Sequence, residues 1–315
     1  MITETRRTLR NAAAPFDCAA CFPAIGKRRF ELRHRLFDRS YRLVAGFISP
    51  SQFLADRFCA WGLPRDRLHV IENGLAVDTA TPRQAKPPGR SEFVFGYFGQ
   101  VNPFKGADVL LRAAQLLGAQ KKPASNIRIR IHGNIIGLDA TFSADLRQLC
   151  DTLPFLEYAG PYNNRQVLEL MGQCDYVVIP SIWWENSPVV IQEAYTAGCP
   201  VICTGIGGMA EKVIDGVSGL HFRRGDAADL LTVMQKAAHA ATFSQLQAGL
   251  PQASSAVEMA RRYVQTTIGL LADEPTHGAT QAIESAPEPV AHRHAVSPKR
   301  KVLSAGNSHL RMQRR

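Results

Sequence analysis

Residues 176–204 read YVVIPSIWWENSPVVIQEAYTAGCPVICT, and this stretch decides the fold. An apolar run rich in β-branched residues is followed by a polar loop, a segment with apolar residues at helical spacing, and a second apolar run. Short β-branched runs bounded by Gly or Pro indicate strands, and a helical pattern between two strands indicates that the strands are parallel. The stretch therefore predicts part of a parallel α/β sheet.

The same alternation extends in both directions, from about residue 92 to residue 222. Strands are expected at 93–98, 127–131, 155–158, 176–180, 200–204 and 219–222. Helices are expected at 106–117, 164–171 and 189–197, with two closing helices at 226–240 and 252–271. This pattern predicts a Rossmann-like parallel sheet with helices on both faces, and ligands of such sheets bind beyond the carboxyl ends of the strands.

Composition limits the classes of protein that the chain fits. No uninterrupted apolar run approaches the ~18 residues that a membrane-spanning helix needs, and no secretory signal opens the chain, so a cytoplasmic location is expected. The net charge of +10 is concentrated in residues 1–42 and 271–315, which leaves the middle nearly neutral. A nucleic-acid-binding core would carry a basic face of its own, so no nucleic-acid partner is expected.

Residues 27–44 read KRRFELRHRLFDRSYRLV and predict a basic amphipathic helix with Phe30, Phe37 and Tyr41 on one face. Two interpretations are open: a helix that packs on the protein, or peripheral contact with the inner, anionic face of a membrane. Cys18 and Cys21 form a CxxC pair, but no second ligand pair lies nearby to complete a zinc site. Zinc or redox chemistry and ordinary thiols are therefore the alternatives there, and no metal site is predicted.

The first candidate site is the loop GQVNPFKG, residues 99–106. Gly99 and Gln100 follow a predicted strand, and Lys105 stands just before a predicted helix. A glycine lets a ligand approach the backbone, the first N–H groups of a helix attract phosphate, and a lysine adds positive charge. The loop lacks the GxxxxGK[ST] order of a P-loop, and a plain strand-to-helix turn explains it as well.

The second candidate site is ENSPVVIQE, residues 185–193. Ser187 suits the N-cap of a helix and Pro188 its first position, which would leave the amides of Val189 and Val190 free to meet phosphate oxygens. Glu193, about one turn into the helix, would face the same ligand, because carboxylates accept hydrogen bonds from paired sugar hydroxyls. A helix with acids near its positive end needs no ligand, so the residues alone leave both interpretations open.

The third candidate site is GIGGMAE, residues 205–211. Gly205, Gly207 and Ala210 match the dinucleotide fingerprint G-x-G-x-x-G/A, but this loop follows the fifth strand of the domain rather than the first. A glycine-lined ligand loop is the preferred interpretation over a site for NAD.

In this order and spacing, the three segments resemble the family-four (group 1) glycosyltransferases of GT-B architecture. The likeness runs from about Phe47 to Leu271 and is strongest in residues 180–222, PSIWWENSPVVIQEAYTAGCPVICTGIGGMAEKVIDGVSGLHF. Glu185 and Glu193 are eight residues apart and look like the family's Glu-x7-Glu signature, which PVI and GG-x-x-E follow.

The resemblance implies a nucleotide-diphosphate-sugar donor, transfer with retention of anomeric configuration, and no metal or other cofactor. It places Lys105 on the diphosphate beside Gly99, Glu193 on the ribose hydroxyls, and Glu185 on the hydroxyls of the transferred sugar. Glu185 and Lys105 are the candidate catalytic residues, and base contacts are expected around Tyr158–Tyr162. The implied donor-binding set is Gly99, Gln100, Lys105, Glu185, Asn186, Ser187, Pro188, Val189, Glu193, Gly207 and Gly208. Many relatives have Arg where this chain has Gln100, which leaves more of the diphosphate charge to Lys105.

The resemblance also implies a domain organisation. Residues 1–81 look like the remnant of an acceptor-side domain, so that the N-terminal half of the GT-B fold is expected to be largely missing. A linker follows at 82–90, a nucleotide-sugar-binding domain at 91–272, and a disordered basic tail at 273–315. The expected function is transfer of a hexose to a glycan or lipid acceptor. The alternative is a non-catalytic or split-enzyme module that binds nucleotide sugar without the acceptor half.

Overall fold

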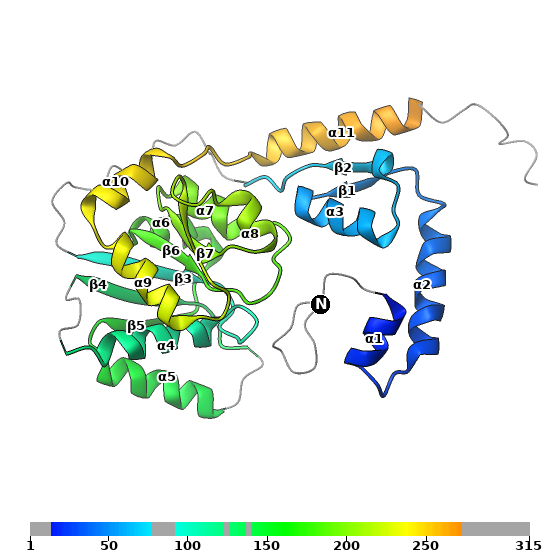
Figure 1. Cartoon of the computed structure of the whole chain (residues 1–315). Coiled ribbons are helices and arrows are strands. Elements are labelled where there is room, and N and C mark those ends of the chain that lie inside the picture. Colours follow the sequence, from blue (N-terminus) through cyan, green and yellow to red (C-terminus); the bar gives the residue numbers. More distant parts are fainter. Residues whose placement is uncertain (1–13, 77–91, 122–125, 137–139, 273–315) are drawn as a thin grey trace, which may run out of the picture. The chain divides into compact units, whose positions relative to one another are not determined.

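Six parallel strands form the main sheet of the computed structural model, which describes residues 14–76, 92–121, 126–136 and 140–272 (Figure 1). Their order is β5-β4-β3-β6-β7-β8, and every neighbouring pair is parallel. The strands are β3 Phe93–Phe98, β4 Ile127–His132, β5 Leu156–Gly160, β6 Tyr176–Ile179, β7 Val201–Thr204 and β8 Gly219–Phe222. The predicted parallel α/β sheet is confirmed, with strand ends that move by one or two residues.

Helices cover both faces of this sheet, as predicted. They are α4 Ala107–Gly118, α5 Ala140–Thr152, α6 Val167–Gly172, α7 Val189–Thr196, α8 Gly207–Lys212, α9 Ala227–Ala237 and α10 Ala240–Ala248. On one face, α4, α5, α9 and α10 bury apolar side chains such as Leu110, Leu146 and Leu230. On the other face, α6, α7 and α8 bury Met171, Ile191 and Met209. Because both faces are covered, the central strands β3, β6 and β7 are apolar almost throughout, whereas β4, nearer one edge, alternates isoleucine with arginine.

The strand order reverses between β3 and β6. From β3 the chain adds β4 and β5 on one side, and from β6 it adds β7 and β8 on the other. The loops that follow β3 and β6 therefore leave the sheet side by side, at the switch point where such folds bind ligands. Gly106 brings them into contact: its φ is 71°, and a Cβ at this position would lie 1.8 Å from the carbonyl oxygen of Pro180. Only glycine fits there.

Residues 14–76 form a smaller two-stranded parallel sheet with its own helices (Figure 1). Its elements are α1 Pro15–Cys21, α2 Lys27–Tyr41, β1 Phe47–Ser49, α3 Gln52–Trp61, the short 3-10 helix η1 Arg65–Arg67 and β2 Leu68–Val70. The last described helix, α11 Ala256–Ala272, returns to this sheet, where the Arg262 guanidinium donates to the carbonyl of Val70 at 2.8 Å. The C-terminal helix α11 therefore contacts the small sheet that precedes the main sheet in the chain.

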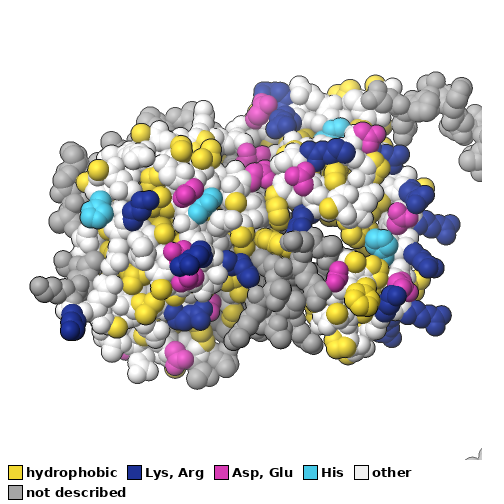
Figure 2. All heavy atoms as spheres, in the orientation of Figure 1, with side chains coloured by type: hydrophobic (Ala, Val, Ile, Leu, Met, Phe, Trp, Pro, Cys, Tyr) yellow, Lys and Arg dark blue, Asp and Glu magenta, His cyan; other side chains and the backbone are white. Residues whose placement is uncertain are grey.

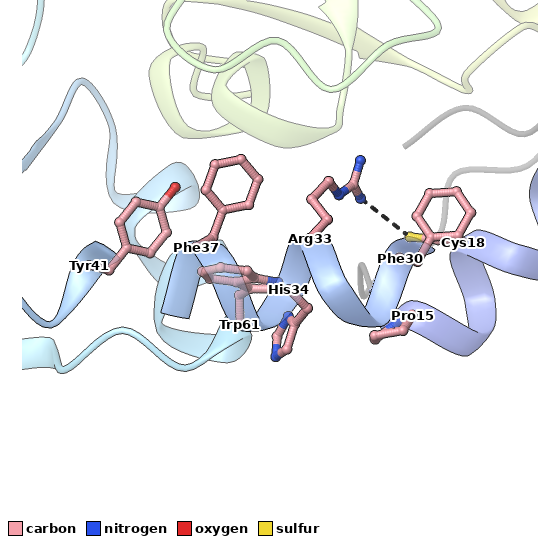
Figure 3. Close-up of a pocket in the computed structure, with 8 residues that line it drawn as sticks. All are labelled: Pro15, Cys18, Phe30, Arg33, His34, Phe37, Tyr41 and Trp61. Carbon is pink, nitrogen blue, oxygen red and sulfur yellow. Dashed lines mark hydrogen bonds between the residues drawn. The ribbon is translucent and has the colours of Figure 1, made fainter. Parts of the chain in front are cut away.

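The aromatic face predicted for residues 27–44 lies along α2 and packs on protein. Tyr41 stacks on Phe37 and meets the ring of Trp61 edge to face, with ring centroids 5.8 and 5.4 Å apart. Figure 3 shows these rings around a small cavity of about 180 Å³ between α1, α2 and the end of α3. Basic side chains gather over the rest of α2 (Figure 2). These contacts favour the packing interpretation, and contact with a membrane stays a prediction.

Cys18 and Cys21 are buried free thiols in α1. The sulfur of Cys18 lies 3.9 Å from the Arg33 guanidinium, which donates to it (Figure 3). Among the described residues, no group of three His, Cys, Asp or Glu side chains is placed to hold a metal ion. In the same part of the chain, no helix combines the length and apolar character that crossing a membrane requires.

The helix prediction was incomplete. The expected helix at 226–240 corresponds to α9, which ends at Ala237, whereas α5 and α10 were not predicted and α11 begins only at Ala256. Only Phe243 and Leu246 of α10 are buried, so its apolar pattern is too short to stand out in sequence. The predicted linker 82–90 and tail 273–315 lie outside the described residues.

Candidate functional site

An ion pair joins the two loops at the switch point. The Nζ of Lys105, in the loop after β3, lies 2.7 Å from Oε1 of Glu185, in the loop after β6. The Oγ of Ser181 donates to the same carboxylate oxygen at 2.9 Å. The Glu185 side chain is only 12% exposed, so a nearby cation and a hydroxyl donor are needed to offset the loss of water around its charge. The structure thus brings together the two residues predicted to be catalytic.

The loop after β3 is shaped by its own polar groups. The side-chain oxygen of Asn102 accepts from the amide of Lys105 at 2.9 Å, and the hydroxyl of Tyr97 donates to the carbonyl of Gln100 at 2.5 Å. Gln100 is exposed, and Gly99 has a φ of 138° with open space where a Cβ would point. A ligand at this edge could therefore approach the Gly99 backbone without meeting a side chain there.

The start of α7 differs from the prediction by one residue. Pro188 is the N-cap, with no side-chain capping bond, and the helix begins at Val189. The prediction that Ser187 is the N-cap and Pro188 the first helical residue was therefore wrong. The proline ring still fits because its φ is −68°, while ψ of 115° keeps it out of the helix. The Ser187 hydroxyl is buried and has no hydrogen-bond partner among the described residues.

The glycine loop after β7 packs directly on the Glu185 loop. The amide of Gly208 donates to the carbonyl of Glu185 at 2.7 Å. A Cβ on Gly208 would lie 2.1 Å from the carbonyl oxygen of Asn186, so no larger residue fits without moving that loop. Gly207 lies over the backbone of Trp184 and Glu185. These glycines allow close contact between the start of α8 and the Glu185 loop, and their contact with a donor stays a prediction.

Glu193 lies on α7, half-buried, and its surroundings differ from those of Glu185. Burial raises the pKa of its carboxyl group above the ordinary value. Burial, followed by the charge of Glu193, raises the pKa of Tyr162, and burial followed by the charge of Glu185 raises that of Tyr97. Each carboxylate therefore lies close enough to one of these phenols to disfavour ionisation of that tyrosine.

The predicted base-binding segment lies at the end of β5, beside the end of β4. The hydroxyl of Tyr158 donates to the carbonyl of Gly133 at 2.9 Å, and the ring of Tyr162 meets those of Phe98 and His132 edge to face. His132 is buried, stacks on Phe98 at 4.6 Å, and has no partner for Nε2 among the described residues. Burial, with a contribution from Arg130, lowers its pKa. The contact of His132 with Tyr162 was not predicted, because one histidine at the end of a strand usually indicates core packing.

Two family models cover most of the described chain. The model described as Glycosyl transferases group 1 matches residues 78–243, and the model described as Glycosyltransferase Family 4 matches residues 20–79. The chain belongs to the group 1 glycosyl transferases. The resemblance inferred from the Glu-x7-Glu segment is confirmed.

Curated relatives that the chain matches include D-inositol 3-phosphate glycosyltransferases. The protein from Mycobacterium sp. (strain KMS) is 30% identical over 200 residues, which cover 56% of this chain and 44% of the relative. The protein from Mycolicibacterium smegmatis is 29% identical over 228 residues, which cover 69% of this chain and 48% of the relative. The chain spans about half the length of the curated relatives it matches.

Solved structures share the fold. Anabaena HepE in complex with UDP-glucose has a TM-score of 0.58 and 22% identity, over 72% of this chain and 64% of that chain. A glycosyltransferase from Rickettsia africae has a TM-score of 0.60 and 18% identity, over 72% and 64%. At this identity the likeness shows the fold alone, and it confirms the predicted Rossmann-like sheet of a GT-B glycosyltransferase.

Proposed function

We propose that the chain binds a nucleotide-diphosphate sugar at the carboxyl edge of its six-stranded sheet and serves transfer of a hexose to a glycan or lipid acceptor. The observation that carries the proposal is the ion pair between Lys105 and Glu185 at the switch point. Neither residue is needed there to hold the sheet together, because the core beneath them is apolar. The pair keeps a cation and a carboxylate poised where a ligand with phosphates and hydroxyls would lie.

Donor binding would exchange the partners of this pair. Lys105 would move its positive charge to the diphosphate, and Glu185 would accept hydrogen bonds from hydroxyls of the hexose. Both groups would then keep a charged or polar partner, so the donor would not leave either one buried and unpaired. The hydroxyl of Ser181, 2.9 Å from Glu185, would hold the carboxylate in place through the exchange.

The chemistry needs stabilisation of the departing diphosphate. Breaking the bond between the sugar and the phosphate places negative charge on the leaving group. Lys105 and the first N–H groups of α7, at Val189 and Val190, would offset that charge, because an α-helix carries partial positive charge at its start. These groups would do the work of a metal ion, which supports a metal-independent reaction. Retention of configuration stays part of the proposal, on the family resemblance.

Two comparisons support the choice of ligands. HepE was solved with UDP-glucose, and the curated relatives are named for transfer to an inositol phosphate. The HepE complex supports a UDP-hexose as the donor, and the names of the relatives support an acceptor with a sugar-like hydroxyl group.

Calorimetric titration of the purified chain with UDP-glucose, GDP-mannose, UDP and GDP tests the proposal. We expect saturable binding of one nucleotide family, with the sugar adding affinity over the bare nucleotide. Transfer is then followed by the release of free nucleotide in the presence of membranes or glycan extract as acceptor. Binding without transfer would support the alternative, a nucleotide-sugar-binding module that works with an acceptor half. No binding of any of the four ligands would overturn the proposal.

A further inference from the structure

The loop that carries Glu185 has contacts besides those of the proposed donor site. Helix α3 belongs to the part of the chain that precedes the six-stranded sheet, and it contacts both α8 and this loop. Helix α3 reaches the loop in two ways: indirectly, through the Glu211 carboxylate of α8, and directly, through side chains that lie against Trp184.

The first contact is made by Glu211, on α8. Its Oε1 accepts from the amide of Gln52 at 2.9 Å, and its Oε2 accepts from the amide of Phe53 at 2.6 Å. The hydroxyl of Ser51 accepts from the next amide, at Leu54, at 3.2 Å. The first amides of α3 thus receive two partners from α8 and one from their own cap. A carboxylate is well suited to this place because a helix carries partial positive charge at its start.

Glu211 lies on the same short helix as Gly208, whose amide holds the carbonyl of Glu185 at 2.7 Å. Because Gly208 has no room for a Cβ against Asn186, α8 and the Glu185 loop are fitted closely at this end. A shift of α8 away from α3 would therefore move the backbone of Glu185.

The second contact is made by Trp184, the residue directly before Glu185. Its ring lies 6.0 Å from that of Phe53, and the guanidinium carbon of Arg57 lies 3.9 Å from its centroid. Phe53 and Arg57 are four residues apart and share one face of α3. Phe53 takes part in both contacts, since its amide binds Glu211 and its ring meets Trp184.

We propose that Glu211 is a positioning residue, which with Trp184 and Arg57 couples α3 to the placement of Glu185. The inference rests on the proposed function, because Glu185 is taken to hold the hydroxyls of the transferred sugar. Among the described residues, the hydrogen bonds of the Glu211 carboxylate go to the amides of Gln52 and Phe53, and none goes to Lys105 or Glu193. Its loss therefore weakens recognition of the sugar and leaves recognition of the nucleotide as it was.

The test compares UDP-glucose with UDP in calorimetric titrations of the wild type and of Glu211→Ala. We expect affinity for UDP-glucose to fall roughly fivefold or more, the lower end of coupling between linked sites, while affinity for UDP stays the same. Glu211→Gln keeps one acceptor for the α3 amides, so it should restore part of the loss. Arg57→Gln, which changes only a partly exposed side chain on α3, should show the same selective loss at a smaller size.

Asp226→Ala is the matched control. Asp226 also caps a helix with its carboxylate, accepting from the amides of Ala228 and Asp229 at the start of α9, but it has no contact with the Glu185 loop in the described residues. This variant should lower stability without changing the ratio of the two affinities. Equal losses for UDP-glucose and UDP in Glu211→Ala, or no loss for either, would overturn the inference.

Amide hydrogen exchange of the ligand-free protein separates this inference from the proposed function. Glu211→Ala should speed exchange in the peptide that covers residues 181–188, and Asp226→Ala should not. Faster exchange with no nucleotide binding by the wild type would keep the coupling and reject the donor site. Unchanged exchange in Glu211→Ala would reject the coupling whatever the protein binds.

Discussion

Glu185 and Glu193 are eight residues apart, and the structure surrounds their carboxylates in different ways. Glu185 is 12% exposed and has a cation and a hydroxyl group within 3 Å, from Lys105 and Ser181. Glu193 is half-buried on α7, and no cation pairs with its carboxylate among the residues that the structure describes. Burial is the cause of its raised pKa.

This difference separates two ways of preparing a site for a polar ligand. Glu185 already has partners, so a ligand must replace them and gains only the difference between old and new contacts. Glu193 has lost part of its water without gaining a cation, so a ligand that supplies hydroxyl donors gains their full effect. We therefore expect Glu193 to contribute more to affinity and Glu185 more to discrimination between sugars.

Replacement of Glu193 should have the largest effect. Glu193→Ala removes the acceptor proposed for two ribose hydroxyls, and hydrogen bonds to a charged group each contribute about 1.5–3 kcal/mol, so affinity for the nucleotide should fall roughly a hundredfold or more. Calorimetry with UDP and UDP-glucose measures the loss. Glu169→Ala, an exposed acid in the first turn of α6, is the control. Unchanged affinity in Glu193→Ala would remove this residue from the site.

Replacement of Lys105 should have a smaller and more selective effect. Lys105→Ala removes the charge proposed for the diphosphate, so UDP should bind about tenfold more weakly while uridine binds as before. The exposed Lys236 of α9 provides the control variant Lys236→Ala. If uridine and UDP lost affinity equally, the lysine would be supporting the loop and not contacting phosphate.

The response to pH should be smallest, and it has a defined sign. The raised pKa of Glu193 means that the folded protein favours its neutral form. Its contribution to stability is therefore present at low pH and is lost as pH rises through the folded pKa. Nucleotide affinity should change in the opposite direction, because the ionised carboxylate is the better acceptor, and should fall as pH is lowered through the same window.

Glu193→Gln should remove both pH dependences. Thermal unfolding would measure the pH dependence of stability, and calorimetry would measure that of nucleotide affinity. Both would use the same samples, at pH values above the ordinary pKa of glutamate. A pH dependence of affinity that survives in Glu193→Gln would assign the titration to another group.

Much of the fold could be predicted because β-branched runs such as YVVIP and VICT have few alternatives to buried strands. The pairing of Lys105 with Glu185 was not predictable from spacing, since it depends on the order in which strands lie in the sheet. Ser181 was missed for the same reason. Ser187 was assigned as a cap because its residue type prefers that position, but the geometry of Pro188 places the helix start one residue later. The residue types of a segment predict that a helix forms, but its first residue depends on the backbone geometry of the folded chain.

The contact between Gly106 and Pro180 has a consequence for how this protein can change. The 1.8 Å left for a Cβ excludes every side chain at position 106, whereas position 99 faces open space and is limited only by its backbone angle. If the donor specificity of this protein changed in evolution, we would therefore expect substitutions at residues 100–104 and an unchanged glycine at position 106. At the switch point, residues 100–104 can therefore be substituted while Gly106 must stay glycine. Donor specificity can change there without loss of the fold.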